Sequence, residues 1–590
     1  MLVAERPDQV VDVLAEVERA TDAGQWAFGY VAYEAAAGLD PGLAVHPPAA
    51  DGTPLAWFGL CDEPVPVPPL DAGPEPPWAA EWEPTWTPAE HASGVARVRE
   101  RIAAGDTYQC NLTVRMAGRV SGDPFGLYRA LALGQRGSHN AYLDLGRFVV
   151  ASASPELFFE WRGDRVLLRP MKGTSRRGRY LREDAALAHR LSASAKERAE
   201  NLMIVDLVRN DVARVARVGS VDVPALFTVE RYGTVLQLTS DVTAQLRPGT
   251  GLVDLFRALF PSGSVTGAPK ASSMALLRGL EPTPRGVYCG AIGLVGPPDA
   301  PVRARFGVAI RTAVVDTASG TAVYGTGGGI TWDSEAAAEH AEVLAKAAVL
   351  SWHPEEFELL ETMRYEPDGG LRNEDGHLRR LADSAEHLGF ALDRPTVVRH
   401  LRTRLAGCGP ARVRLRLRRD GATAVDVEPL PAPAPGPVRL AIDGEPVDSG
   451  DLRLHHKTSR REPYDRRRRR RPDVDDVVLV NERGEVTEVT TANLAVRLDG
   501  RWWTPPQESG CLPGVERARL LGLGMLRERV VPVADLVRAE EVAVLSSLRG
   551  WRSATLVHDA TAPADRSGAP GAAPEASGES RGSDGGAVST

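Results

Sequence analysis

Two successive series of strand-like and helix-like segments constrain the fold of this 590-residue chain more than any other feature. Between about Trp82 and Trp352, apolar runs such as RFVVASASPELFFEW and TAVYGTGGGI alternate with helix-forming segments such as HASGVARVRERIAAG. A second series starts at Phe357 with FELLETMRY and the helix-forming stretch NEDGHLRRLADSAEHLGF. Alternation of this kind, without an obvious repeat, is typical of domains that combine sheets with helices.

The chain is too long for one hydrophobic core, because domains usually span roughly 100–200 residues. Residues 1–80 contain a helical segment and apolar runs that predict strands joining the first sheet, and they end in the proline-rich connector Pro64–Pro77. We expect the main part of the first domain over residues 81–352 and the second domain over residues 353–557. Residues 558–590 are rich in Gly, Pro and Ser, so they predict a disordered tail.

Charge and cysteine usage limit the function classes. The net charge of −8 comes from interspersed acidic and basic residues, which gives no electrostatic case for nucleic acid or an anionic membrane as partner. No stretch approaches the ~18 apolar residues of a membrane span, and the N-terminus lacks an apolar signal core. The five cysteines are far apart, so they indicate neither a disulfide framework nor a zinc site. We expect a soluble protein of the cytoplasm that acts on small polar or anionic substrates.

Two helix-forming segments carry paired carboxylates. Glu197 and Glu200 stand three residues apart in KERAENLMIVDLVRND, and Glu339 and Glu342 have the same spacing in EAAAEHAEVLAKAAVL. On a helix each pair lies on one face, and the two pairs together offer four hard oxygen donors that suit Mg²⁺. The alternative is that each pair belongs to the solvated face of an amphipathic helix.

Lysine is rare in this chain. Only five of its 70 basic residues are lysines, namely Lys172, Lys196, Lys270, Lys346 and Lys457. Because arginine stays protonated and cannot act as a nucleophile, the retained lysines are candidates for amine chemistry, although retention by chance is the alternative.

Lys172 lies in RPMKGTSRRG, which predicts a tight loop after an apolar strand. Crowding by Arg169, Arg176 and Arg177 would favour its neutral, nucleophilic amine. Upstream, Glu156 in SPELFF is a candidate proton donor or acceptor. The glycine-rich strings PSGSVTGAPK and GTGGG predict turns whose backbone N–H groups receive carboxylates, with a purely structural turn as the alternative. The Arg466–Arg471 run predicts a solvated loop rather than a basic binding patch.

The strings AGDTYQCNLT, SPELFF, RPMKGT, KERAENLMIVDLVRND, FPSGSVTGAPK, RGVYCGAIGLV and AIRT resemble the chorismate-utilising family in the family's order. The resemblance covers about Gly24 to Trp352. It implies that Glu200 and Glu342 ligate Mg²⁺, while Glu197 and Glu339 support the ion mainly through water. It also implies that the substrate's other carboxylate is held by a small set of residues, namely Tyr288, Arg311 and the Gly327 to Gly329 backbone, with Ser264 nearby.

Residue 172 separates two branches of that family. Anthranilate synthases carry alanine there, whereas aminodeoxychorismate synthases carry lysine, as in this chain. The resemblance implies that Lys172 attacks C2 of chorismate as the 4-hydroxyl leaves, that ammonia then adds at C4 and expels the lysine, and that Glu156 serves as acid and base. Gln237, where anthranilate synthases have histidine, further disfavours the ortho product. No tryptophan-sensing motif or glutaminase signature is visible, so we expect ammonia from solution or from a separate glutamine amidotransferase subunit.

The second series carries the parts of a pyridoxal phosphate site. Lys457 in RLHHKTSRREPYD can form a Schiff base and Glu488 can pair with a pyridinium nitrogen. The phosphate would be held by Arg380, the backbone of Gly514 and Val515, and Ser547. From about Phe357 to Arg552 the sequence resembles the fold-type IV aminotransferases and their relative aminodeoxychorismate lyase. This resemblance implies that Lys457 forms the internal aldimine and takes the proton from the substrate carbon.

Adjacency then suggests two consecutive reactions, from chorismate to the folate precursor 4-aminobenzoate. The expected fold is a two-sheet α/β (α+β) chorismate-binding domain followed by an α+β fold-type IV pyridoxal phosphate module that commonly dimerises. Three alternatives stay open: a second unit that transaminates an ordinary amino acid, an anthranilate or isochorismate synthase fused to such a transaminase, and a non-catalytic scaffold for an amidotransferase.

Overall fold

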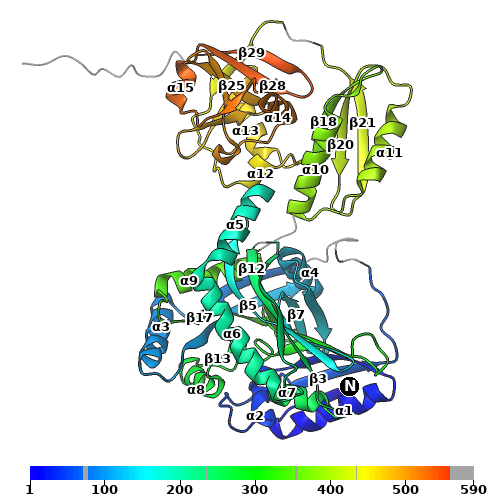
Figure 1. The fold of residues 1–590 in the computed structure, drawn as a ribbon, viewed down its shortest axis with the longest axis vertical. Helices are drawn as coiled ribbons and strands as arrows, with labels where there is room; N and C mark the ends of the chain where they lie inside the picture. The colour runs from blue at the N-terminus through cyan, green and yellow to red at the C-terminus, as the bar shows by residue number, and fades with distance from the viewer. Residues whose placement is uncertain (69, 71–77, 234, 352–355, 433–434, 558–590) are drawn as a thin grey trace, which may run out of the picture.

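A computed structural model describes residues 1–68, 70, 78–233, 235–351, 356–432 and 435–557 (Figure 1). The predicted tail 558–590 and most of the second half of the proline-rich connector lie outside the described residues. Two units follow each other along the chain, each built on two sheets with helices packed around them. The predicted α/β and α+β fold class is thereby confirmed.

The first sheet of the first unit contains ten strands in the order β1-β3-β2-β14-β15-β8-β9-β12-β10, with β11 paired to β12. N-terminal strand β2 pairs antiparallel with β14, for example Val31 with Ala291, so the N-terminal segment does join this sheet. The strands are β1 (Leu2–Ala4), β2 (Trp26–Val31), β3 (Ala56–Cys61), β8 (Leu157–Arg162), β9 (Arg165–Arg169), β10 (Met171–Arg176), β11 (Asp222–Arg231), β12 (Val235–Gln245), β14 (Ala291–Val295) and β15 (Ala304–Val308).

The second sheet of this unit follows the order β13-β5-β17-β16-β7-β6, with β4 paired to β5. Its strands are β4 (Trp78–Pro84), β5 (Gln109–Gly122), β6 (His139–Asp144), β7 (Phe148–Ser154), β13 (Gly267–Ala268), β16 (Thr312–Asp316) and β17 (Thr321–Ile330). The string GTGGG therefore lies within strand β17, not in the predicted turn, and Lys172 lies in strand β10, not in the predicted loop.

Helices cover the two sheets and place the paired carboxylates. Helix α6 (Ala195–Ala213), which contains Glu197 and Glu200, begins where the Ser194 hydroxyl accepts a hydrogen bond from the Glu197 N–H at 3.4 Å. It packs against β10 and β12, while α9 (Ala336–Ala347) packs against β17. The other helices of this unit are α1 (Val10–Asp22), α2 (Ala36–Leu39), α3 (Pro88–Ala103), α4 (Pro124–Gln135), α5 (Leu181–Ala193), α7 (Leu252–Leu259) and α8 (Lys270–Leu280).

The second unit has a small four-stranded sheet, β19-β18-β20-β21, and a larger eight-stranded one, β24-β23-β22-β29-β28-β25-β26-β27. The small sheet contains β18 (Leu359–Glu366), β19 (Gly370–Leu371), β20 (Ala411–Leu417) and β21 (Thr423–Pro429). The large sheet contains β22 (Val438–Ile442), β23 (Asp476–Val480), β24 (Val486–Val489), β25 (Asn493–Leu498), β26 (Arg501–Thr504), β27 (Arg527–Glu528), β28 (Glu541–Ser546) and β29 (Gly550–Leu556). The helices are α10 (Glu374–Leu388), α11 (Arg394–Leu405), α12 (Leu452–His455), α13 (Glu462–Arg470), α14 (Val515–Gly522) and α15 (Val533–Val537).

The arginine run of the second unit differs from the prediction. Most of Arg466–Arg471 belongs to helix α13 and not to a solvated loop. Arg467 is buried and its Nε lies 2.6 Å from Asp443, while Arg466 and Arg470 pair with Glu445. Neutralisation by these carboxylates allows consecutive arginines to share a helix.

The two units meet where α5 begins, and Figure 1 shows α5 running from the first unit toward α12. The Tyr180 hydroxyl donates to Glu508 at 2.8 Å, and the Arg179 carbonyl accepts from His456 Nε2 at 3.0 Å. The His456 ring also stacks on His387, with centroids 4.9 Å apart. Among the described residues, none of the helices has the length and apolar character needed to cross a membrane.

Candidate active sites

Lys172 points from β10 toward the glycine strand β17. A Cβ atom added to Gly329 would overlap both the Lys172 Nζ and the Gln109 side-chain amide. Glycine at position 329 is therefore needed for the amine to lie against this strand. The predicted crowding by arginine is offset, because Arg169 pairs with Asp241, Arg176 with Glu183 and Arg177 with Asp184.

Glu156 lies between β7 and β8 and is almost fully buried. Burial raises the pKa of its carboxyl to about 7, against the lowering influence of the Ser264 hydroxyl and the Lys172 ammonium. Two further predicted residues, Ser264 and Lys172, thus both act on Glu156. A carboxyl with a pKa near neutrality is suited to proton transfer.

Three of the four paired carboxylates, Glu197, Glu339 and Glu342, lie close enough to Lys172 to be influenced by its charge, and Glu200 acts on Glu197. Burial, followed by the like charge of Glu200, raises the pKa of Glu197, and burial together with Glu342 raises the pKa of Glu339. A Cβ atom on Gly328 would lie 3.1 Å from Glu339 Oε2, so this carboxylate reaches the glycine strand.

Glu342 is engaged by a lysine. Its Oε1 lies 2.5 Å from Lys346 Nζ, which also donates to the Gly327 carbonyl at 2.7 Å. Within the described part of the chain, no three Asp, Glu, His or Cys side chains come close enough to coordinate one ion. The hard oxygen donors and their mutual repulsion fit a divalent cation, but binding it would require Glu342 to exchange Lys346 for the metal.

Two further predicted substrate residues, Tyr288 and Arg311, lie beside the same strand. Tyr288 is buried against Gly325, where any Cβ would overlap its ring, and the Arg115 guanidinium lies 5.3 Å from the ring centroid. Arg311 donates to the Lys346 carbonyl at the end of α9. Gln237, on β12, accepts from the Thr174 hydroxyl at 3.1 Å.

Gln109 was missed by the sequence predictions. It is 1% exposed at the start of β5, and neither polar atom of its amide has a hydrogen-bond partner among the described residues. Burial of an unpaired amide is costly, and this amide beside Lys172 is therefore available to bind a ligand. The signal in the sequence was a glutamine at the head of an apolar strand within AGDTYQCNLT.

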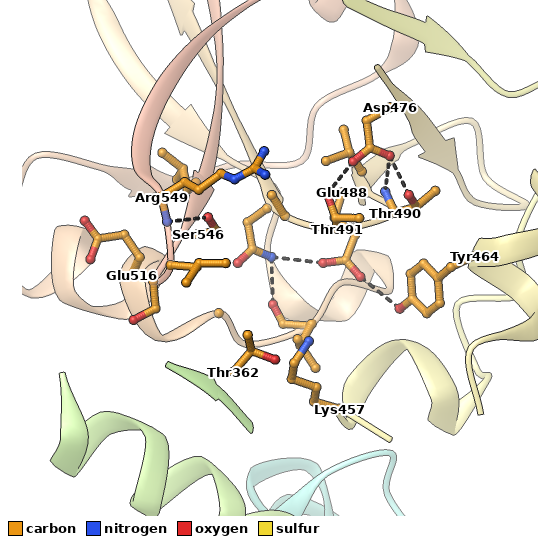
Figure 2. A pocket seen from close by; sticks show the side chains of 18 of the residues that line it. Thr362, Lys457, Tyr464, Asp476, Glu488, Thr490, Thr491, Glu516, Ser546 and Arg549 are labelled. Carbon is orange, nitrogen blue, oxygen red and sulfur yellow. Dashed lines mark hydrogen bonds between the residues drawn. The ribbon is translucent and has the colours of Figure 1, made fainter. Parts of the chain in front are cut away.

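The second unit contains a cavity of about 1080 Å³ between its two sheets, and Lys457 lines it (Figure 2). Burial, with the charges of Arg380 and Arg461, lowers the pKa of the Lys457 amine to about 8. The Lys457 carbonyl accepts from the Leu360 N–H at 2.8 Å, which fixes the backbone beside strand β18.

Glu488 faces the same cavity and is held by two donors, as the dashed lines in Figure 2 show. The Tyr464 hydroxyl donates to Oε1 at 2.9 Å and the Asn493 amide donates to Oε2 at 3.1 Å. Burial raises the pKa of Glu488 to about 7, although Tyr464 and Lys457 act to lower it. Tyr464 and Asn493 were not predicted, since they lie 24 and 5 residues from Glu488 in the sequence.

The predicted phosphate-binding residues line one cavity, namely Arg380, Gly514, Val515 and Ser547. Arg380 donates to the Pro513 carbonyl at 3.3 Å, just before helix α14 starts at Val515. A Cβ at Gly514 would overlap the Asn493 amide, so glycine is required there. A buried amine, a carboxylate, a guanidinium and a helix N-terminus around one cavity fit pyridoxal 5′-phosphate chemically.

Comparison with known protein families finds a match for each of the two units. Residues 5–351 match the family of chorismate binding enzymes, and residues 358–557 match the amino-transferase class IV family. The chain therefore belongs to the chorismate-binding enzymes and carries a class IV aminotransferase domain after the chorismate-binding one.

Individual relatives match about half of the chain. Aminodeoxychorismate synthase component 1 of Bacillus subtilis (strain 168) is 37% identical over 273 residues, which are 46% of this chain and 57% of that protein. Anthranilate synthase component 1 of Streptomyces coelicolor is 41% identical over 271 residues, or 46% of this chain and 52% of that protein. The solved anthranilate synthase component I of Streptococcus pneumoniae TIGR4 is 27% identical, with a TM-score of 0.49, covering 57% of this chain and 85% of that one. The chain spans about half the length of these two curated relatives.

Proposed function

We propose that the chain makes 4-aminobenzoate in two steps. The first unit aminates chorismate to 4-amino-4-deoxychorismate, and the second unit eliminates pyruvate from that compound. The observation that carries the proposal is Lys172. Aminodeoxychorismate synthase component 1 and anthranilate synthase component 1 relatives resemble the chain to a similar degree, and a lysine amine against Gly329 supports the aminodeoxychorismate route.

In the first step a C–N bond forms between the Lys172 amine and C2 of chorismate as the C4–O bond breaks. Glu156, with a pKa near 7, is available to protonate the departing hydroxyl so that it leaves as water. Ammonia then forms a C–N bond at C4, and the bond to Lys172 breaks, which restores the amine. We infer that the ammonia comes from a separate glutamine amidotransferase subunit, as the "component 1" names of the relatives suggest.

Mg²⁺ would supply electrostatic stabilisation of the substrate carboxylate and of the leaving hydroxyl. Glu200 and Glu342 would hold it, with Glu197 and Glu339 behind them. Tyr288, Arg311 and the backbone from Gly327 to Gly329 would orient the second carboxylate of the substrate, with Ser264 beside Glu156.

In the second step pyridoxal 5′-phosphate would supply an electron sink for negative charge at the substrate carbon. The Lys457 amine has a pKa of about 8, so it loses its proton as the pH rises through that value. In its neutral form it would move the proton at that carbon. Glu488 would face the ring nitrogen. Arg380, Ser547 and the Gly514 and Val515 backbone would hold the phosphate. We also propose that the second unit associates as a homodimer, which sedimentation of the full chain tests.

Product chromatography tests the proposal. Full-length protein is incubated with chorismate, Mg²⁺, an ammonium salt and pyridoxal 5′-phosphate, alongside Lys172→Ala and Lys457→Ala. We expect 4-aminobenzoate and pyruvate from the unmodified chain, aminodeoxychorismate alone from Lys457→Ala, and neither product from Lys172→Ala.

Each alternative has its own outcome. Anthranilate as the product would overturn the role of Lys172. Accumulation of aminodeoxychorismate by the unmodified chain would show that the second unit is not its lyase. No turnover and no cofactor absorbance, in protein that is folded, would favour a non-catalytic scaffold.

A further inference from the structure

A carboxylate lies where strand β18 should present an apolar side chain. Leu359, Glu361 and Met363 alternate onto the same buried face of β18, and each is at most 1% exposed. Leu359 and Met363 pack in the hydrophobic core of the small sheet. Because burial of an unpaired carboxylate is strongly destabilising, Glu361 requires compensating partners.

Two cationic or hydrogen-donating groups of helix α10 supply that compensation. Arg380 donates to Glu361 through Nε at 2.9 Å and through its second terminal nitrogen at 2.5 Å. His377, three residues earlier on the same helix face, donates from Nδ1 at 2.6 Å. Burial alone would raise the pKa of Glu361, but Arg380 and His377 lower it to about 2, so the carboxylate is ionised at neutral pH.

Both partners extend from Glu361 to the wall of the cavity that holds Lys457. Arg380 lines the cavity and also contacts the Pro513 carbonyl beside the start of α14. His377 Nε2 lies 2.8 Å from the hydroxyl of Ser547, just after strand β28. One carboxylate thus organises two groups on separate elements, α10 and the segment after β28.

A carboxylate that merely anchored α10 to β18 would need only one of these contacts. Instead, the hydrogen bonds end on Arg380 and Ser547, the two side chains that would hold the cofactor phosphate. Glu361 itself is not among the residues that line the cavity, so any effect on a bound molecule has to pass through Arg380 and His377.

We propose that Glu361 is a positioning residue for the cofactor phosphate, orienting Arg380 directly and Ser547 through His377. The inference rests on the proposed pyridoxal phosphate site. Residues that orient the ligands of a bound metal commonly contribute about 10–100-fold in affinity, and we expect an effect of the same size for a residue that orients Arg380 and Ser547.

The test measures cofactor affinity of cofactor-stripped, full-length protein. Glu361→Gln is titrated with pyridoxal 5′-phosphate and, separately, with pyridoxal, which lacks the phosphate. We expect affinity for pyridoxal 5′-phosphate to fall about 10–100-fold, with little change for pyridoxal, and the phosphorus NMR signal of bound cofactor to shift. Glu366→Gln is the matched control, because Glu366 lies on the same strand and pairs with Arg364 outside the cavity.

Equal losses for the two ligands, or no loss for either, would overturn the positioning role. If Glu361→Gln fails to fold, His377→Gln tests the branch to Ser547 alone, and its loss should not add to that of Ser547→Ala. Additive losses would count against the inference. Failure of the unmodified chain to bind pyridoxal 5′-phosphate would instead refute the proposed function of the second unit.

Discussion

The two candidate sites differ in how their polar groups are satisfied. In the second site, Glu488 has two donors and Glu361 has two partners, so the chain itself fixes each carboxylate. In the first site, the Gln109 amide and Glu156 Oε1 have no hydrogen-bond partner among the described residues. The second site is preorganised by protein contacts, whereas the first keeps buried polar groups available for a ligand.

We expect the largest effect from removing the proton donor of the first site. Glu156→Gln should lower chorismate amination by about 10²–10⁴-fold, the usual contribution of a general acid. Because burial raises the pKa of Glu156 to about 7, its acid form is lost as pH rises through 7. The rate should therefore fall above pH 7 in the unmodified chain, and this limb should be absent in the variant.

Glu160→Gln is the control for that comparison, since Glu160 lies on the adjoining strand and pairs with Arg162 and Arg305 away from Lys172. Steady-state rates across pH measure both variants. An unchanged alkaline limb in Glu156→Gln would mean that another group carries the proton.

We expect a smaller effect from loss of a magnesium ligand, and only in the first reaction. Glu200→Gln should weaken Mg²⁺ activation of the first reaction by about 10²-fold. Pyruvate release from supplied aminodeoxychorismate should stay unchanged, because the second site contains no comparable group of paired carboxylates in the residues described. Magnesium titration of each half-reaction measures this, with exposed Glu335→Gln as control. Equal loss in both half-reactions would contradict the assignment.

Two matched substitutions, one in each site, should change the stability of the fold in opposite directions. Gln109→Leu removes a buried amide that has no partner, so it should stabilise the fold by about 1–3 kcal/mol while raising KM for chorismate. Asn493→Leu removes a donor to Glu488 and to the Leu512 carbonyl, so it should destabilise by a similar amount. Thermal unfolding of both variants measures the difference, and shifts of the same sign would refute it.

The smallest effect concerns the junction between the units. Tyr180→Phe removes the hydrogen bond to Glu508 and should cost about 1 kcal/mol or less. Both half-reactions should keep their rates, while calorimetry should show a slightly lower unfolding temperature. Tyr108→Phe, at an exposed position of the first unit, is the control and should leave that temperature unchanged.

Motifs local in sequence predicted a large part of this architecture. The strings around Lys172 and Lys457 indicated two units and their classes, and the structure groups Arg380, Glu488 and Ser547 around one cavity. Glu361 and His377 escaped notice because their roles depend on contacts between separate elements. The GTGGG string predicted a turn but forms a strand, since its missing side chains make room for Tyr288 and Lys172.

Strand β10 carries Lys172 and leads within eight residues to Tyr180, whose neighbour Arg179 accepts a hydrogen bond from His456, next to Lys457. Seven residues of backbone and one hydrogen bond therefore connect Lys172 with His456, the neighbour of Lys457, although 285 positions separate the two lysines in the chain. If the chain were cut between the units, these contacts would have to form between two separately diffusing proteins. Fusion therefore keeps the two units in contact and in equal number.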